Sequence, residues 1–228
     1  MNLHRHIPNV FTSLNLATGV FGIINAFTGD HTLTIYYVLL AGIFDFLDGF
    51  LARMLKVSGD FGKELDSLAD MVTFGILPSV FLFQASNAAG FPIWVCYSSV
   101  VVAVFSGIRL AQFNIDDSQN HGFKGLPTPA NSIMLTTLGL TPMVVSNHLY
   151  FLTVVIISSY LLISSIPMIA LKYKSFGFRG NEERYLFLLA VVGLMVTLGI
   201  EALPFVIPTY IVASVVAAIA SRSDGKEA

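Results

Sequence analysis

Long apolar runs separated by short polar segments dominate this sequence. A helix needs roughly 20 apolar residues to span a bilayer. Eight runs approach that length, at 10–28, 32–55, 66–88, 92–113, 127–147, 149–171, 185–201 and 203–220. The pattern predicts an all-α integral membrane protein with eight transmembrane helices.

Composition supports this class. Hydrophobic residues make up 55% of the 228 residues and charged residues only 11%, whereas about 25% of a soluble domain is charged. The net charge of -2 argues against a nucleic-acid partner, and the lone Cys96 excludes an internal disulfide. Without internal repeats or linkers, residues 1–228 read as one membrane domain whose first helix is retained rather than cleaved.

The cations lie on one side of the predicted topology. All twelve fall at the two ends of the chain or after the second, fourth and sixth runs: Arg5, Arg53, Lys56, Lys63, Arg109, Lys124, Lys172, Lys174, Arg179, Arg184, Arg222 and Lys226. Cytoplasmic loops are enriched in Lys and Arg, so both termini are predicted to be cytoplasmic. Aromatic residues are expected at the opposite interface: Tyr36, Tyr37, Trp94, Tyr97, Tyr150 and Phe151.

The segment DFLDGFLARMLKVSGDFGKELDSLAD, at 45–70, carries six acids next to apolar runs. Asp45 and Asp48 are three positions apart, and Asp66 and Asp70 are four apart, so each pair lies on one helix face. The short connection between the two helices makes them antiparallel neighbours. The four carboxylates are therefore predicted to converge in a cleft that faces the cytoplasm.

These acids indicate a metal site. An acid inside a membrane costs about 2.5–3.5 kcal/mol on insertion scales, and the single nearby Arg53 cannot neutralise four carboxylates. Carboxylate ligands favour Mg²⁺ or Mn²⁺, and four acids suit two ions. Small residues one turn away leave room for a pyrophosphate or phosphodiester: Gly49, Ala52 and Gly62.

The same residues resemble the signature of the CDP-alcohol phosphotransferase family. The resemblance rests on eight positions at fixed spacing: Asp45-x2-Asp48-Gly49-x2-Ala52-Arg53-x8-Gly62-x3-Asp66-x3-Asp70. It implies a six-helix membrane core, at about 5–171, to which the helices at about 185–220 are additions. It also implies transfer of a phosphatidyl-type group from a CDP-linked donor to an alcohol, with release of CMP.

The resemblance assigns roles to residues. It places Asp45, Asp48 and Asp66 on the metal and makes Asp70 both a ligand and the catalytic base. Gly49, Ala52 and Gly62 would line the nucleotide site with support from Arg53. Thr12 and Asn15, near one turn apart in the first run, are expected to face the same cleft and bind the donor.

Further stretches are similar to the phosphatidylserine synthase branch: IPNVFTSLNLATG, GIRLAQFNID and FKGLPTPAN. This similarity implies CDP-diacylglycerol and L-serine as substrates, a homodimer, and a bacterial cytoplasmic membrane. Arg109, Asn114 and Lys124 are candidates for binding the acceptor or a phosphate. The chain departs from the branch at Gln112 and Asn131, where Arg and Ala are common.

Two other interpretations compete with serine transfer. Within the family, the acceptor could be glycerol-3-phosphate or inositol phosphate, which need additional cations for a second phosphate. Outside it, a divalent-cation transporter could use intramembrane acids, although its ligands usually lie near the bilayer midplane between inverted repeats. An aspartyl protease needs only two Asp and leaves the Gly, Ala and Arg spacing unexplained.

Overall fold

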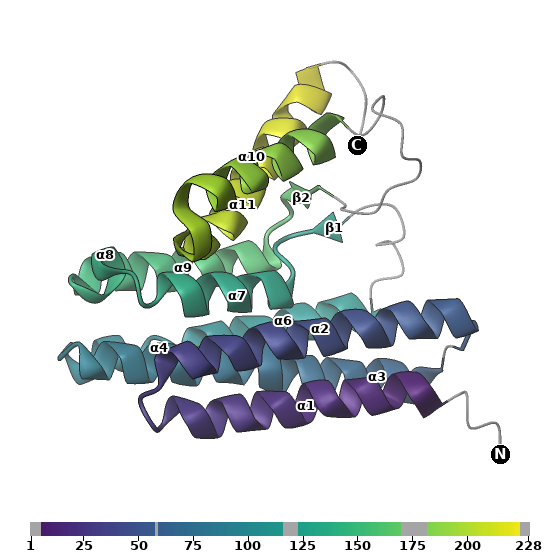
Figure 1. The fold of residues 1–228 in the computed structure, drawn as a ribbon, viewed down its shortest axis with the longest axis horizontal. Coiled ribbons are helices and arrows are strands. Elements are labelled where there is room, and N and C mark those ends of the chain that lie inside the picture. The colour runs from purple at the N-terminus through teal and green to yellow at the C-terminus, as the bar shows by residue number, and fades with distance from the viewer. Residues whose placement is uncertain (1–5, 58, 116–122, 170–181, 224–228) are drawn as a thin grey trace.

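The computed structural model describes residues 6–57, 59–115, 123–169 and 182–223 (Figure 1). The first half contains α1 (Ile7–Ala26), α2 (His31–Leu55), α3 (Asp60–Asp70), the π-helical segment η2 (Met71–Ile76), α4 (Leu77–Ala88), α5 (Ile93–Tyr97) and α6 (Val100–Ile115). The second half contains β1 (Phe123–Lys124), α7 (Thr128–Leu138), α8 (Pro142–Val145), α9 (His148–Ile163), β2 (Pro167–Met168), α10 (Glu182–Leu198), the 3₁₀ segment η4 (Gly199–Ala202) and α11 (Leu203–Ser223). The chain is thus mostly helical, as predicted.

Four continuous helices in the described part of the chain are long and apolar enough to cross a membrane: Ile7–Ala26, His31–Leu55, Asp60–Ala88 and Ile93–Ile115. They correspond to the first four predicted spans and confirm the membrane class. Among the described residues, the predicted spans at 149–171, 185–201 and 203–220 correspond to shorter apolar helices, so the count of eight and the orientation stay predictions. Of the cations used for that orientation, Arg5, Lys172, Lys174, Arg179 and Lys226 lie outside the described residues.

Two predicted spans are interrupted. The span predicted at 127–147 is broken, because α7 ends at Leu138 and α8 begins at Pro142, where proline cannot donate the next helical hydrogen bond. The span predicted at 149–171 stops at Ile163, and the chain then forms β2. β2 pairs antiparallel with β1, with Phe123 opposite Met168 and Lys124 opposite Pro167.

The helices form layers (Figure 1). α1, α2, α3–α4 and α6 form one side of the bundle, α7 and α9 cover it, and α10 and α11 cross the outer face of α7 and α9. One apolar cluster lies between α4, α6, α7 and α9, and a second joins α7, β2 and α11. Phe151 corrects a prediction: it is 1% exposed in the first cluster, against Phe91, rather than at an interface.

Local sequence sets the helix ends that position the acids. Asp30 caps α2, because its carboxylate accepts a hydrogen bond from the N–H of Leu33 at 2.9 Å. At the other end, Lys56 adopts a left-handed conformation with φ of 52°. α3 starts a few residues later, after the extended Gly59. The end of α2 therefore lies beside the start of α3, at the same end of the bundle as the start of α1 (Figure 1).

Close packing holds α1 against η2. A Cβ on Gly19 would overlap the hydroxyl of Thr73 and lie 3.0 Å from Thr73 Cα. One turn earlier on α1, the carbonyl of Asn15 accepts a hydrogen bond from Thr73 Oγ1 at 3.2 Å. Small residues allow such close approach between membrane helices. The contact fixes α1 relative to the helix that carries Asp70.

Candidate metal and nucleotide site

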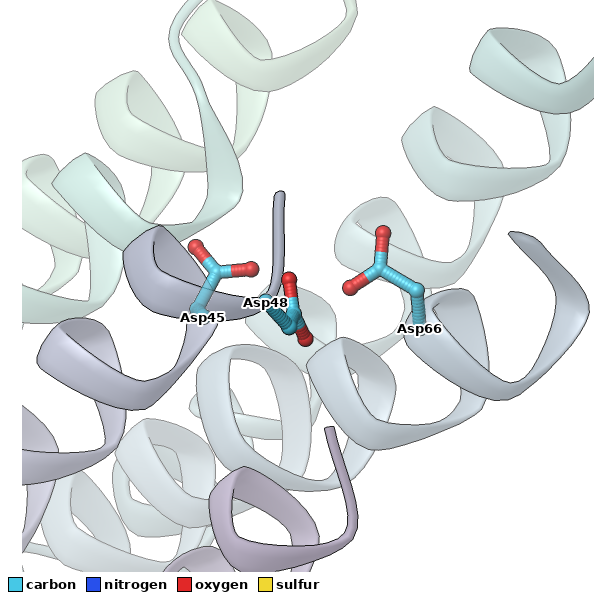
Figure 2. Close-up of side chains that lie close together, drawn as sticks. All are labelled: Asp45, Asp48 and Asp66. Carbon is cyan, nitrogen blue, oxygen red and sulfur yellow. The ribbon is translucent and has the colours of Figure 1, made fainter. Parts of the chain in front are cut away.

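Three of the predicted metal ligands form a compact cluster (Figure 2). Asp45 and Asp48 come from one face of α2, and Asp66 comes from α3. One carboxylate oxygen from each lies within 4.8 Å of the others. The three-residue spacing on α2 and the antiparallel approach of α3 produce this convergence, as the sequence predicted.

Few protein groups neutralise the negative charge of this cluster. Asp48 is 6% exposed, and within the described residues its Oδ2 and the Oδ1 of Asp66 are buried without a hydrogen-bond partner. Arg53 is the cation that interacts with Asp48. Buried unpaired carboxylates are costly, and an all-oxygen donor set suits a hard divalent cation. The residues present therefore fit a divalent metal ion.

Asp70 lies at the edge of this cluster rather than in it. Its side chain is buried, and its Oδ1 accepts a hydrogen bond from the Nδ2 of Asn15 at 3.2 Å. The carboxyl groups of Asp70 and Asp45 are close enough to interact electrostatically. Asn15 thus contacts Asp70, and its assignment to donor binding stays a prediction. The assignment of Asp70 as ligand and base stays a prediction.

A cavity of about 610 Å³ opens beside the cluster, and Asp48 and Asp66 form part of its wall. Its lining includes four predicted donor-site residues, which come from α1, α2 and α3: Thr12, Gly49, Ala52 and Gly62. Arg53 is exposed and is not part of the lining, although its guanidinium lies near Gly49.

Sequence reasoning missed several lining residues, among them His6, Asn9, Phe61 and Lys63. These residues lie at the start of α1 and the start of α3, next to the acidic helix ends, and this position in the sequence could have identified them as cavity residues. Asn9 stands at the point where α1 meets α3, because its Oδ1 would be 3.3 Å from a Cβ on Gly62.

The three candidate acceptor residues do not form one pocket. Asn114 faces α3, because its side-chain amide donates to Ser67 Oγ at 2.9 Å and its backbone carbonyl accepts from Lys63 Nζ at 2.6 Å. Arg109 is five positions earlier, which turns it by about 140° around α6. Its Nη1 donates to the carbonyls of Lys124 at 3.0 Å and Leu162 at 2.8 Å. The side chain of Lys124 is exposed.

Comparison with known proteins identifies a family and relatives of this chain. A sequence model of the CDP-alcohol phosphatidyltransferase family matches residues 5–220. The chain is 28% identical over 216 residues to the CDP-diacylglycerol–serine O-phosphatidyltransferase of Helicobacter pylori, covering 92% of this chain and 89% of that protein. It is 36% identical over 132 residues to the protein of the same name from Methanocaldococcus jannaschii, covering 57% and 58%.

An archaeal relative extends the comparison. The chain is 29% identical over 163 residues to the archaetidylserine synthase of Methanothermobacter thermautotrophicus, covering 70% of this chain and 68% of that protein. The family match includes all four aspartates and nearly every described helix. This chain therefore belongs to the CDP-alcohol phosphatidyltransferase family.

Proposed function

We propose that this protein transfers the phosphatidyl group of CDP-diacylglycerol to the hydroxyl of L-serine, giving phosphatidylserine and CMP. The observation that carries the proposal is the cavity beside the acids, because Asp48 and Asp66 belong both to its wall and to the three-carboxylate cluster. Relatives whose names specify serine transfer support the choice of acceptor.

The cavity suits the nucleotide part of the donor. Gly49, Ala52 and Gly62 leave space along one wall, and Thr12 offers a hydroxyl from α1. Lys63 lines the same cavity and supplies a cation for a phosphate oxygen. We place cytidine and the diphosphate there, with the acyl chains in the bilayer.

The four aspartates have two roles, metal binding and proton transfer. Asp45, Asp48 and Asp66 would hold Mg²⁺ or Mn²⁺, as two ions if Asp70 also serves as a ligand. When bound, the metal supplies charge neutralisation for the diphosphate and for the departing CMP. Asp70, oriented by Asn15, accepts the proton of the serine hydroxyl. The serine oxygen bonds to the phosphorus that carries diacylglycerol, and the bond from that phosphorus to CMP breaks.

The proposed orientation in the membrane is based on the distribution of charge along the chain. We propose eight transmembrane helices, both termini in the cytoplasm, and an active site at the cytoplasmic face of a bacterial inner membrane. In support, the start of α1, the α2–α3 junction and the β1–β2 pair lie at one end of the bundle (Figure 1). We also infer a homodimer, from the family resemblance.

The test is CMP release by the purified protein with CDP-diacylglycerol and Mn²⁺, offering serine, glycerol-3-phosphate and inositol phosphate separately. We expect release that requires serine and disappears with a chelator or in Asp66→Ala. The matched control is Glu64→Ala, which removes an exposed acid from the same helix. Release with another alcohol would replace serine as the acceptor. A folded, metal-binding sample without any release would favour cation transport.

A further inference from the structure

α11, which lies outside the six-helix core implied by the family resemblance, binds both the N–H and the carbonyl of one residue, Ile169. The hydroxyl of Tyr210 donates to the carbonyl of Ile169 at 2.8 Å. The N–H of Ile169 donates to Ser214 Oγ at 3.1 Å. Tyr210 and Ser214 are four positions apart on α11 and therefore share one helix face. All three residues are buried.

Ile169 directly follows β2, and β2 is hydrogen-bonded to the segment that precedes α7. β2 pairs with β1, and beyond that pair the N–H of Gly125 donates to the carbonyl of Ile166 at 2.9 Å. The N–H of Leu126 donates to the carbonyl of Leu161 at 2.8 Å. The segment at 123–127, which we call the β1–α7 corner, is thus tied to β2 and the end of α9.

Arg109 completes the attachment. It is 8% exposed, and its Nη1 bonds to Lys124 in the corner and to Leu162 at the end of α9. Among the described ionisable residues, its interacting neighbour is Tyr210. Because this buried guanidinium donates to backbone carbonyls, it holds the backbone of these two segments in place. Arg109 and α11 therefore hold the same corner from two directions.

The corner is followed by α7, none of whose described residues line the donor cavity. α7, which begins there, packs against α2 and η2, the elements that carry Asp45 and follow Asp70. Asp48 and Asp66 line the cavity, whereas Asp45 and Asp70 do not. In phosphoryl transfer the attacking and leaving oxygens are roughly in line. With CMP leaving into the cavity, the acceptor approaches from the side of Asp45, Asp70 and α7.

We propose that Tyr210, Ser214 and Arg109 are positioning residues for the acceptor step, because they hold the β1–α7 corner against the acceptor side of the site. This inference rests on the proposed function. It gives α11 a role in acceptor use, with no part in donor or metal binding.

Tyr210→Phe tests the inference, because it removes one hydroxyl and keeps the ring that packs against Phe187. Ser214→Ala removes the other hydrogen-bond partner of Ile169. Matched controls are Tyr36→Phe and Ser146→Ala, which alter exposed side chains elsewhere. For each purified variant, CMP release is measured against serine concentration and against CDP-diacylglycerol concentration, together with the slow release to water without serine.

We expect Tyr210→Phe and Ser214→Ala each to raise the KM for serine by about tenfold, which is the effect of losing one buried hydrogen bond. The KM for CDP-diacylglycerol and the release to water should stay at wild-type values, and both controls should match the wild type. A fall in kcat with an unchanged KM for serine would overturn the inference, as would equal changes in both KM values.

Two further outcomes are also decisive. If Tyr210→Phe fails to fold, Ser214→Ala decides alone, since it acts on the same residue, Ile169, with a smaller change in volume. If the wild-type protein releases no CMP in response to serine, the proposed function fails and takes the inference with it. That failure is visible in the wild type, whereas failure of the inference alone appears only in the variants.

Discussion

Replacement of Gly19 by alanine tests the closest helix contact near the site. The new methyl group would overlap Thr73 Oγ1 and lie 3.0 Å from both the Cα and the Cβ of Thr73. Rotation of the threonine side chain relieves only the first of these contacts, because the other two involve atoms fixed by the backbone of η2. α1 and η2 must therefore move apart.

The expected cost follows from two opposing effects. Alanine gains about 1 kcal/mol over glycine in helix propensity, whereas overpacking costs about 1–3 kcal/mol, and a backbone clash belongs to the upper part of that range. A net loss of about 1–2 kcal/mol lowers the midpoint of thermal unfolding by about 2–8 °C for a chain of this size.

The same substitution should also lower the rate of CMP release. The bond from Asn15 to Asp70 is 3.2 Å long, so a separation of only about 0.3 Å brings it to the limit of a hydrogen bond. Asn15 lies one turn from Gly19 on the same face of α1. With Asp70 no longer oriented, we expect serine-dependent CMP release to fall by about tenfold or more.

The assay combines thermal unfolding in detergent with CMP release. Gly42→Ala is the matched control, because a Cβ at Gly42 meets nothing within 4 Å. Thr73→Ala combined with Gly19→Ala should cost less than the sum of the single changes, since the hydroxyl clash is then absent. A Gly19→Ala protein with wild-type unfolding and wild-type turnover would refute the close packing of α1 on η2.

Three other changes test the site and the corner. Asp70→Asn should lower serine-dependent CMP release by about 10²- to 10⁴-fold at unchanged expression, and wild-type rates would refute the assignment of the base. Asn15→Ala should lower kcat by about tenfold while the KM for CDP-diacylglycerol stays constant; an unchanged kcat would show that Asp70 needs no orienting partner. Gly125→Ala should cost about 1–2 kcal/mol in unfolding free energy, because φ is +74° and a Cβ would lie 2.7 Å from the carbonyl oxygen of Leu162. The control is Gly193→Ala, because a Cβ at Gly193 meets nothing within 4 Å. Equal unfolding midpoints of the two variants would contradict the expectation.

Sequence reasoning located the acids because helical spacing alone determines which side chains share a face. Asp45 and Asp48 follow this rule, and the short connection brings Asp66 to them. The four long helices were predictable for a similar reason, since each contains enough consecutive apolar residues. These features depend on neighbours close in the chain.

Features that depend on distant parts of the chain were not predictable. The hydrogen bonds of Arg109 go to the carbonyls of Lys124 and Leu162, and because any residue type supplies a carbonyl, the sequence does not identify these partners. The partner of Asn15 is Asp70, 55 positions away. The position of Phe151 in the core likewise follows from the packing of α9 on its neighbours.

The π-helical segment η2 gives the third long helix two separate registers. A π-helical turn takes in about one residue more than an α-helical turn, so Asp66 and Asp70 before it and Phe81 after it do not share one continuous phase. Deletion of a single residue within 71–76 would return this turn to α-helical geometry and leave the acids and the apolar half on their present faces. Alignments with homologous chains should therefore allow a one-residue gap within 71–76.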